Sequence, residues 1–321
     1  MTYPRFTLLL LLAGALTITS CKKKGCTDPD AENYNAEAKK DDGSCTFSEL
    51  EVPTTYAFTD DAGNSTVSYS GQTDRLNQLE EMTTYMKSGT GAALDAQVLK
   101  DMFANTGDDG GGNFSFSSSK QLQSKCYEAD TSMFIEWMDS LTEASIDFAT
   151  TASEGQAGIL VSGSSTYLFS ANGIEYTQLI EKGLMGAVFM NQALNVYFGS
   201  GKMDVDNTTA EDPGNGKYYT EMEHHWDEAF GYFGVSTDFP TNTTDIRFWG
   251  KYCNSRDAQL GSNAAMMNAF LAGRTAIINN DYTERDAQIL AARKMWERVC
   301  AAQAVDYLTQ ASDNFGTDTG K

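Results

Sequence analysis

Two carboxylates and an imidazole occur at helical spacing in the segment 221–232. Glu221, His225 and Glu228 stand at positions i, i+4 and i+7, which a helix with about 100° per residue places on one arc. Imidazole nitrogen together with carboxylate oxygen is a donor set that suits zinc or iron. The spacing therefore predicts a transition-metal site formed by these three side chains. The alternative is a solvated acidic face on which the carboxylates only stabilise a charged histidine.

A second candidate is Arg274, which lies in an otherwise apolar segment, 266–278. On a helical wheel it falls near the centre of a wide arc of apolar side chains: Met266, Met267, Phe270, Leu271, Ile277 and Ile278. An unpaired buried charge costs several kcal/mol, so a carboxylate should contact the guanidinium. We predict a buried ion pair with Glu228 or Glu175. The alternative is that the methylene stem of Arg274 covers apolar surface while its charged end reaches water.

Several classes of function are excluded by what the sequence contains. It has 2 histidines, His224 and His225, and neither H-E-x-x-H nor G-x-S-x-G occurs, which removes most hydrolase triads and zinc peptidase motifs. Segment 199–203 lacks the leading glycine and the hydroxyl of a phosphate-binding loop. We therefore predict no catalytic and no cofactor-binding residue. A formal net charge of −21 repels polyanions and excludes nucleic acid as a partner.

The N-terminus has the layout of an export signal. Arg5 precedes an apolar run over 6–16, and the segment closes on Ile18-Thr19-Ser20-Cys21. Small residues ahead of a cysteine resemble the bacterial lipobox, in which the cysteine thiol receives diacylglycerol. We predict a signal peptide over 1–20 and a lipidated Cys21 that anchors the protein to a membrane of the bacterial cell envelope. We expect this membrane to be the outer membrane. The sequence does not decide between its periplasmic side and its surface side.

Next to the anchor, Cys26 and Cys45 bracket a short polar loop. The segment 25–45 resembles a small cysteine-bracketed module found near the start of bacteroidete-type surface lipoproteins. We expect 21–48 to be a spacer closed by a Cys26–Cys45 disulfide, which stabilises so short a loop by roughly 3 kcal/mol. Of the three cysteines that follow, Cys126, Cys253 and Cys300, at least one should be a free thiol.

The elements that must position these residues are mostly helical. Apolar residues recur at helical spacing in seven segments: 73–87, 94–105, 121–150, 174–198, 218–233, 258–278 and 283–310. A short strand is expected at 66–69 and a hairpin at 159–169. We predict that 49–321 forms one mainly α domain, an up-and-down helical bundle with short β-hairpin insertions.

Two family resemblances support this interpretation. The strings YSGQT (69–73), NGIEY (172–176), HHWDEAFGY (224–232) and GRTAI (273–277) resemble an uncharacterised family of bacteroidete lipoproteins. His225-x-x-Glu228 also resembles the H-x-x-E helix of imelysin-like proteins, which are helical-bundle envelope proteins linked to iron uptake and once described as peptidases. The glycine that this second family has two residues before the histidine is Glu223 here. The resemblance implies an imelysin-like fold and an iron-related role.

The sequence thus predicts an envelope lipoprotein with a helical domain that binds iron or zinc in an uptake role. Two alternatives stay open. A metallopeptidase-like enzyme would need a third ligand and an open coordination position. A structural lipoprotein that docks an envelope protein would present an exposed aromatic patch around Phe248 and Trp249.

Overall fold

The computed structural model describes residues 22–29, 31–46 and 49–315. The chain divides into two compact units, one ending at Leu50 and the other beginning at Glu51. The predicted signal peptide and Cys21 lie outside the described residues. Within those residues, no helix is both long enough and apolar enough to cross a bilayer.

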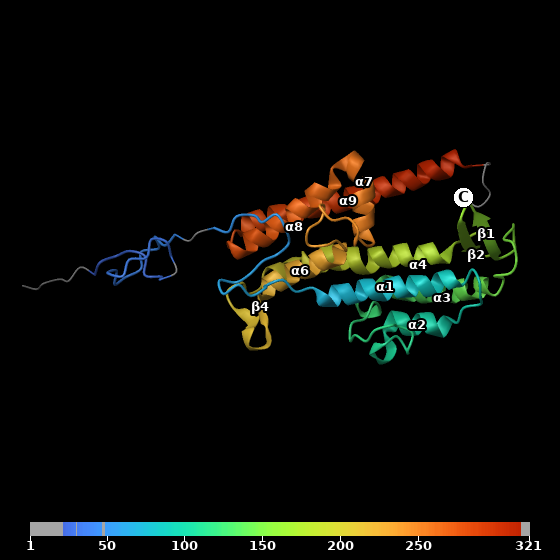
Figure 1. Ribbon diagram of the computed structural model, residues 1–321, viewed down its shortest axis with the longest axis horizontal. Helices are drawn as coiled ribbons and strands as arrows, with labels where there is room; N and C mark the ends of the chain where they lie inside the picture. Colours follow the sequence, from blue (N-terminus) through green and yellow to red (C-terminus); the bar gives the residue numbers. More distant parts are fainter. Residues whose placement is uncertain (1–21, 30, 47–48, 316–321) are drawn as a thin grey trace, which may run out of the picture. The chain divides into compact units, whose positions relative to one another are not determined.

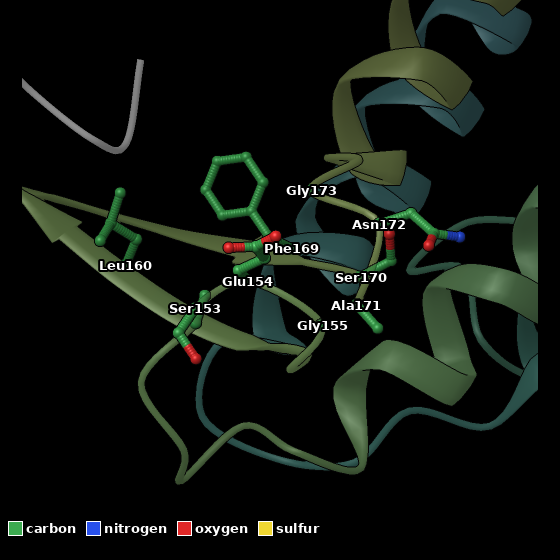
Figure 2. A pocket seen from close by; sticks show the side chains of 10 residues that line it. Ser153, Glu154, Gly155, Leu160, Phe169, Ser170, Ala171, Asn172 and Gly173 are labelled. Carbon is green, nitrogen blue, oxygen red and sulfur yellow. The ribbon is translucent and has the colours of Figure 1, made fainter. Parts of the chain in front are cut away.

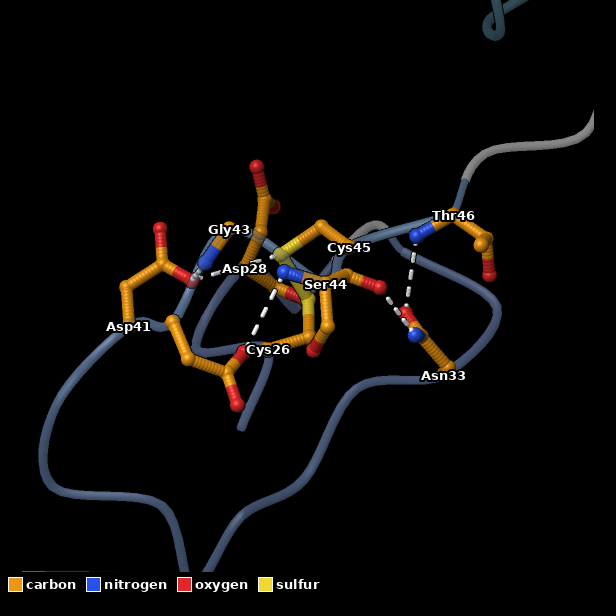
Figure 3. The surroundings of a disulfide bond; sticks show 9 residues. Cys26, Asp28, Asn33, Asp41, Gly43, Ser44, Cys45 and Thr46 are labelled. Atoms are coloured by element: carbon orange, nitrogen blue, oxygen red, sulfur yellow. Dashed lines mark hydrogen bonds between the residues drawn. A yellow bond between two sulfur atoms is a disulfide. The ribbon is translucent and has the colours of Figure 1, made fainter. Parts of the chain in front are cut away.

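The first unit is held together by a disulfide and by short polar contacts. Cys26 and Cys45 are bonded, with their Cα atoms 4.7 Å apart (Figure 3). The backbone N–H of Thr46 donates to the side chain of Asn33 at 2.8 Å, and that of Gly43 donates to Asp41 at 3.0 Å. The predicted disulfide is confirmed. Among the described cysteines, Cys126, Cys253 and Cys300 are free thiols.

The second unit is mainly helical (Figure 1). Its α-helices are α1 (Ser70–Ser88), α2 (Ala96–Ala104), α3 (Thr131–Ser145), α4 (Tyr176–Leu184), α5 (Ser200–Met203), α6 (Glu221–Phe233), α7 (Trp249–Leu260), α8 (Ser262–Ile278) and α9 (Tyr282–Asp313). Two π-helical segments, η4 (Met185–Met190) and η5 (Gln192–Tyr197), continue α4. Single 3₁₀ turns are η1 (Thr106–Asp108), η2 (Gln123–Lys125), η3 (Glu128–Asp130) and η6 (Pro213–Asn215).

The strands form two small antiparallel hairpins. β1 (Gly158–Ser162) pairs with β2 (Ser165–Phe169), and β3 (Ala210–Asp212) pairs with β4 (Lys217–Thr220). The prediction of a mainly helical domain with short β-hairpins is confirmed. The short strand expected at 66–69 is not formed, because Thr66 bonds back to Phe58 and the chain then turns directly into α1.

One predicted helix is divided in two. The segment expected as a helix over 258–278 forms the end of α7 and all of α8, separated by Gly261, whose φ of +60° is in the left-handed region. Glycine adopts this conformation without a Cβ clash, and it ends α7 in the manner of a helix C-cap. Because the chain reverses there, α7 and α8 pack against each other and both contact α9 (Figure 1).

Helix α6 occupies the middle of the second unit. It packs on α1, α8 and the π-helical segment η5. Its core-facing side chains Trp226, Phe230 and Phe233 are buried and contact rings from other elements, including Phe270 of α8 and Trp296 of α9. A helix surrounded in this way must bury its polar side chains as well. Glu223, His225 and Asp227 are buried, so these side chains must find partners inside the fold.

Candidate functional site

The start of α6 is fixed by a capping box. Thr220 Oγ1 accepts a hydrogen bond from the backbone N–H of Glu223 at 3.2 Å, and Glu223 Oε2 accepts one from the backbone N–H of Thr220 at 2.8 Å. This reciprocal arrangement satisfies two N–H groups of the first turn and sets the helical register. Glu221, His225 and Glu228 consequently lie along one side of the helix, as predicted.

These three side chains meet, but not around a single point. His225 Nδ1 lies 3.1 Å from Glu228 Oε2, whereas His225 Nε2 lies 3.5 Å from Glu221 Oε1. The carboxylates therefore contact opposite edges of the imidazole ring. Over the described residues, no three His, Cys, Asp or Glu side chains converge in a way that could hold a metal ion. The expected set of three direct ligands is not formed, because the carboxylates at positions i and i+7 approach different nitrogens of the His225 ring.

Glu228 is the centre of a small polar network between α6, α1 and η5. Its Oε1 accepts hydrogen bonds from Gln72 Nε2 at 2.9 Å and from the Tyr197 hydroxyl at 3.1 Å. Burial acts to raise the pKa of this carboxyl, but the hydrogen bond from His225, the nearby His224 and the bonds from Gln72 and Tyr197 outweigh it and lower the pKa. Glu228 is therefore ionised at neutral pH and acts as an acceptor at each of these contacts.

The imidazole of His225 is left with one unsatisfied edge. Because ionised Glu228 can only accept, Nδ1 must carry the hydrogen, and the neutral ring then presents a lone pair at Nε2. His225 is 6% exposed, and its Nε2 has no hydrogen-bond partner in the described part of the chain. A lone pair that faces a carboxylate oxygen at 3.5 Å is unfavourable unless a positive charge lies between the two atoms. A proton or a metal cation can supply that charge.

Arg274 is fully buried, as its position predicted, but its partners are different. Nη1 lies 2.6 Å from Glu223 Oε1, and Nε lies 3.1 Å from Asp227 Oδ1. The expected partners, Glu228 and Glu175, were wrong. Glu223 and Asp227 are four residues apart, so they share the face of α6 that packs on α8, while Glu228 is turned by about 100° toward α1 and η5. The alternative in which Arg274 reaches water is also wrong, since its side chain is 0% exposed.

Asp227 joins three parts of the fold. It accepts from the Tyr56 hydroxyl at 2.7 Å and from the Ser68 backbone at 2.9 Å, in addition to Arg274. Burial raises the pKa of Asp227 to about 6, and the attraction of Arg274 opposes this rise. The carboxyl is thus ionised at neutral pH. The spacing of Glu223 and Asp227 at i and i+4 was the signal in the sequence that could have identified this pair.

Glu175 has a different environment. It stands at the N-cap position of α4, and burial raises the pKa of its carboxyl to about 7.

The aromatic patch expected at Phe248 and Trp249 is absent from the described surface. The two residues are 7% and 6% exposed, and Trp249 Nε1 donates to the backbone oxygen of Met185 at 2.8 Å. This feature therefore gives no support to a docking function.

A separate cavity lies beside the β1–β2 hairpin. It has a volume of about 840 Å³, and its walls carry one charged side chain, Glu154 (Figure 2). The ring of Phe169 and the side chain of Asn172 also lie around it (Figure 2). None of its lining residues belongs to the His225 network. The residues predicted to do chemistry and this cavity are therefore distinct features of the molecule.

The fold and the polar side chains of α6 define a mainly helical domain with a buried, incompletely satisfied histidine site. Residues 53–321 match a family described as a domain of unknown function (DUF4856), and the chain belongs to that family. The sequence had predicted an uncharacterised family, and this part of the prediction is confirmed. No curated protein and no solved structure matches the chain.

Proposed function

We propose that this protein is a lipid-anchored binding protein of the cell envelope and that its helical unit binds zinc or ferrous iron at His225. In this proposal, His225 Nε2 and a Glu221 oxygen are metal ligands, and Glu228 orients the ring. The observation that carries the proposal is the buried Nε2 atom, which has no hydrogen-bond partner in the described residues and faces the Glu221 carboxylate.

The distance between the two atoms fits a shared metal ion. Bonds of about 2.0–2.2 Å at a tetrahedral angle place a nitrogen and an oxygen ligand about 3.4 Å apart. His225 Nε2 and Glu221 Oε1 are 3.5 Å apart. Glu221 is the more exposed partner, with 48% of its side chain accessible, so rotation of this side chain gives an ion a route to Nε2.

Glu228 has the properties of a supporting carboxylate. Metal-bound histidines usually donate their second ring N–H to a carboxylate or carbonyl, which fixes the tautomer and strengthens the ligand. Glu228 accepts from Nδ1 in this way and is held by Gln72 and Tyr197. Tyr197 comes from a π-helical segment, a rare element that is frequent at functional sites. Glu228 therefore changes role from the predicted direct ligand to a residue that positions His225.

Binding is favoured over catalysis by the number of protein ligands. Catalytic zinc sites commonly use three protein ligands and keep one position open. His225 and Glu221 supply two, and the other positions are left for water or for a ligand that arrives with the metal. The resemblance of His225-x-x-Glu228 to the helix of imelysin-like proteins supports iron as the cargo and uptake as the role.

The metal site can be tested by thermal unfolding of the detergent-solubilised full chain. Zinc or ferrous iron at about 100 times Kd should raise the Tm of the wild type by roughly 5 °C, and His225→Ala should abolish the shift. Glu228→Gln should weaken binding by about 10- to 100-fold without abolishing it. His224→Ala is the matched control, because His224 Nδ1 lies 3.0 Å from the Ser68 backbone oxygen and its ring stacks on Tyr219. Equal Tm shifts in the wild type and in His225→Ala would contradict the metal site and would show that these side chains form only a charged helix face.

The anchor has its own test. Cys21→Ser should prevent lipidation, because the thiol is the acyl acceptor, and should move the protein from the membrane fraction to the soluble fraction. Incorporation of a radiolabelled fatty acid measures the modification directly. Cys126→Ser, which removes a thiol that is free in the structure, should incorporate the label like the wild type. Label that persists in Cys21→Ser would contradict the proposed anchor.

A further inference from the structure

A pocket of about 320 Å³ lies between α1, α4 and α7, and its walls are unusually rich in lysine for this chain. Lys87 comes from α1, Lys182 from α4 and Lys251 from α7. The whole sequence has 44 acidic side chains against 23 lysines and arginines. Three lysines around one hollow therefore stand out against the negative charge of the molecule.

The charges of the pocket do not cancel. Two glutamates also line the pocket, and each has a cationic partner. Glu181 pairs with Lys182 at 3.1 Å, and Glu80 lies 3.6 Å from Arg247, which is not a lining residue. Within the described part of the chain, Lys87 and Lys251 have no carboxylate oxygen at ion-pair distance, although the charge of Lys87 acts on Glu175 to lower the pKa of that carboxyl. Both side chains are exposed. Two positive charges thus remain available to a ligand.

The N-terminus of α7 adds a further positive potential. This helix of 12 residues begins at Trp249 without a side-chain cap, and Phe248 before it has φ +42° and ψ −107°. A positive φ is strained for an aromatic residue, and such strain is found at ligand-binding sites. Backbone N–H groups at an uncapped helix start attract anions. Phe248, which precedes the helix, and Lys251 and Tyr252 of the first turn all line the pocket.

One buried hydroxyl at the pocket lacks a partner. Thr83 lines the pocket and is 6% exposed, and its Oγ1 has no hydrogen-bond partner in the described residues. A buried hydroxyl without a partner is unfavourable. An oxygen of a bound ligand would provide the missing acceptor or donor. This feature is independent of the lysines and of the helix terminus.

We propose that this pocket binds a small molecule through an oxyanion group, a phosphate or a carboxylate. Lys87 and Lys251 contact the oxyanion, the first turn of α7 adds its N–H potential, and Thr83 donates from the pocket wall. The volume is at the small end of the range for small-molecule sites. The ring of Tyr252, with Lys182 Nζ 5.4 Å from its centroid, forms an aromatic wall for the rest of the ligand.

Isothermal titration calorimetry on the detergent-solubilised full chain tests this proposal, with inorganic phosphate and acetate as separate probes at constant ionic strength. Binding of one or both is expected, and the probe that binds identifies the group. Lys251→Gln and Lys87→Gln should each lower the affinity by about tenfold, and Thr83→Val should lower it severalfold. Because both lysines are exposed, their replacement should leave the Tm unchanged.

Two controls make the result decisive. Lys294→Gln removes an exposed lysine of α9 outside the pocket and should bind like the wild type. The wild type should also bind the oxyanion in the presence of a metal chelator, so the result is separate from that of the metal site. The proposal is overturned if neither probe binds to the wild type, or if Lys87→Gln and Lys251→Gln bind as tightly as Lys294→Gln.

Discussion

Replacement of Arg274 by methionine is expected to lower the free energy of unfolding by about 3 to 5 kcal/mol. The guanidinium is 0% exposed and contacts both Glu223 and Asp227, so its removal leaves two buried carboxylates without their cation. It also removes the contacts of Nη2 to Thr66, at 3.2 Å to the backbone oxygen and 3.1 Å to the hydroxyl. The segment before α1 would therefore lose these hydrogen bonds to α8.

Chemical denaturation monitored by circular dichroism measures this loss. Adding Asp227→Asn to Arg274→Met should recover part of the stability, because the second substitution removes one uncompensated charge. Arg298→Met is the matched control: Arg298 is exposed on α9, and its replacement should change stability by less than about 0.5 kcal/mol. A loss below roughly 1 kcal/mol for Arg274→Met, with no coupling to Asp227, would show that the buried ion pair contributes little.

Gly273→Ala is the second substitution with a large expected effect. A Cβ at this position would lie 2.1 Å from Cη2 of Trp226, a ring that is 0% exposed and whose Nε1 donates to the Phe270 backbone oxygen at 3.0 Å. Overpacking of this kind typically costs about 1–3 kcal/mol. Alanine gains only about 1 kcal/mol in helix propensity over glycine, so a net destabilisation is expected because the buried indole must move.

Thermal unfolding and the tryptophan emission spectrum together report this change. Gly186→Ala is the control, since a Cβ at Gly186 meets no atom within 4 Å and should not lower the stability. A rise in Tm for Gly273→Ala, with an unchanged emission spectrum, would contradict the close approach of α8 to Trp226.

Features that depend on one helix could be predicted from the sequence. The wheel of 221–232 correctly brought His225 together with Glu221 and Glu228, because the angle between residues is fixed within a helix. The burial of Arg274 followed from its apolar neighbours for the same reason. The Cys26–Cys45 bridge was expected because the two cysteines bracket a short loop and because the segment resembles a known module.

Features that depend on how elements meet could not be predicted in this way. A wheel gives no information on which face of α6 packs against α8, so the partners of Arg274 were assigned to Glu228 and Glu175 instead of Glu223 and Asp227. The spacing also could not show that Glu221 and Glu228 approach opposite nitrogens of His225. The π-helical segments after α4, which place Tyr197 against Glu228, have no clear signature in the periodicity of 174–198.

The metal content of the purified full chain is the most direct test of the proposed site. After incubation with zinc and dialysis, elemental analysis by mass spectrometry should find about one zinc ion per chain in the wild type and in His224→Ala. It should find none in His225→Ala, which lacks the Nε2 donor that faces Glu221. Equal zinc content in the wild type and His225→Ala, whether both bind or neither does, would contradict the proposed metal site.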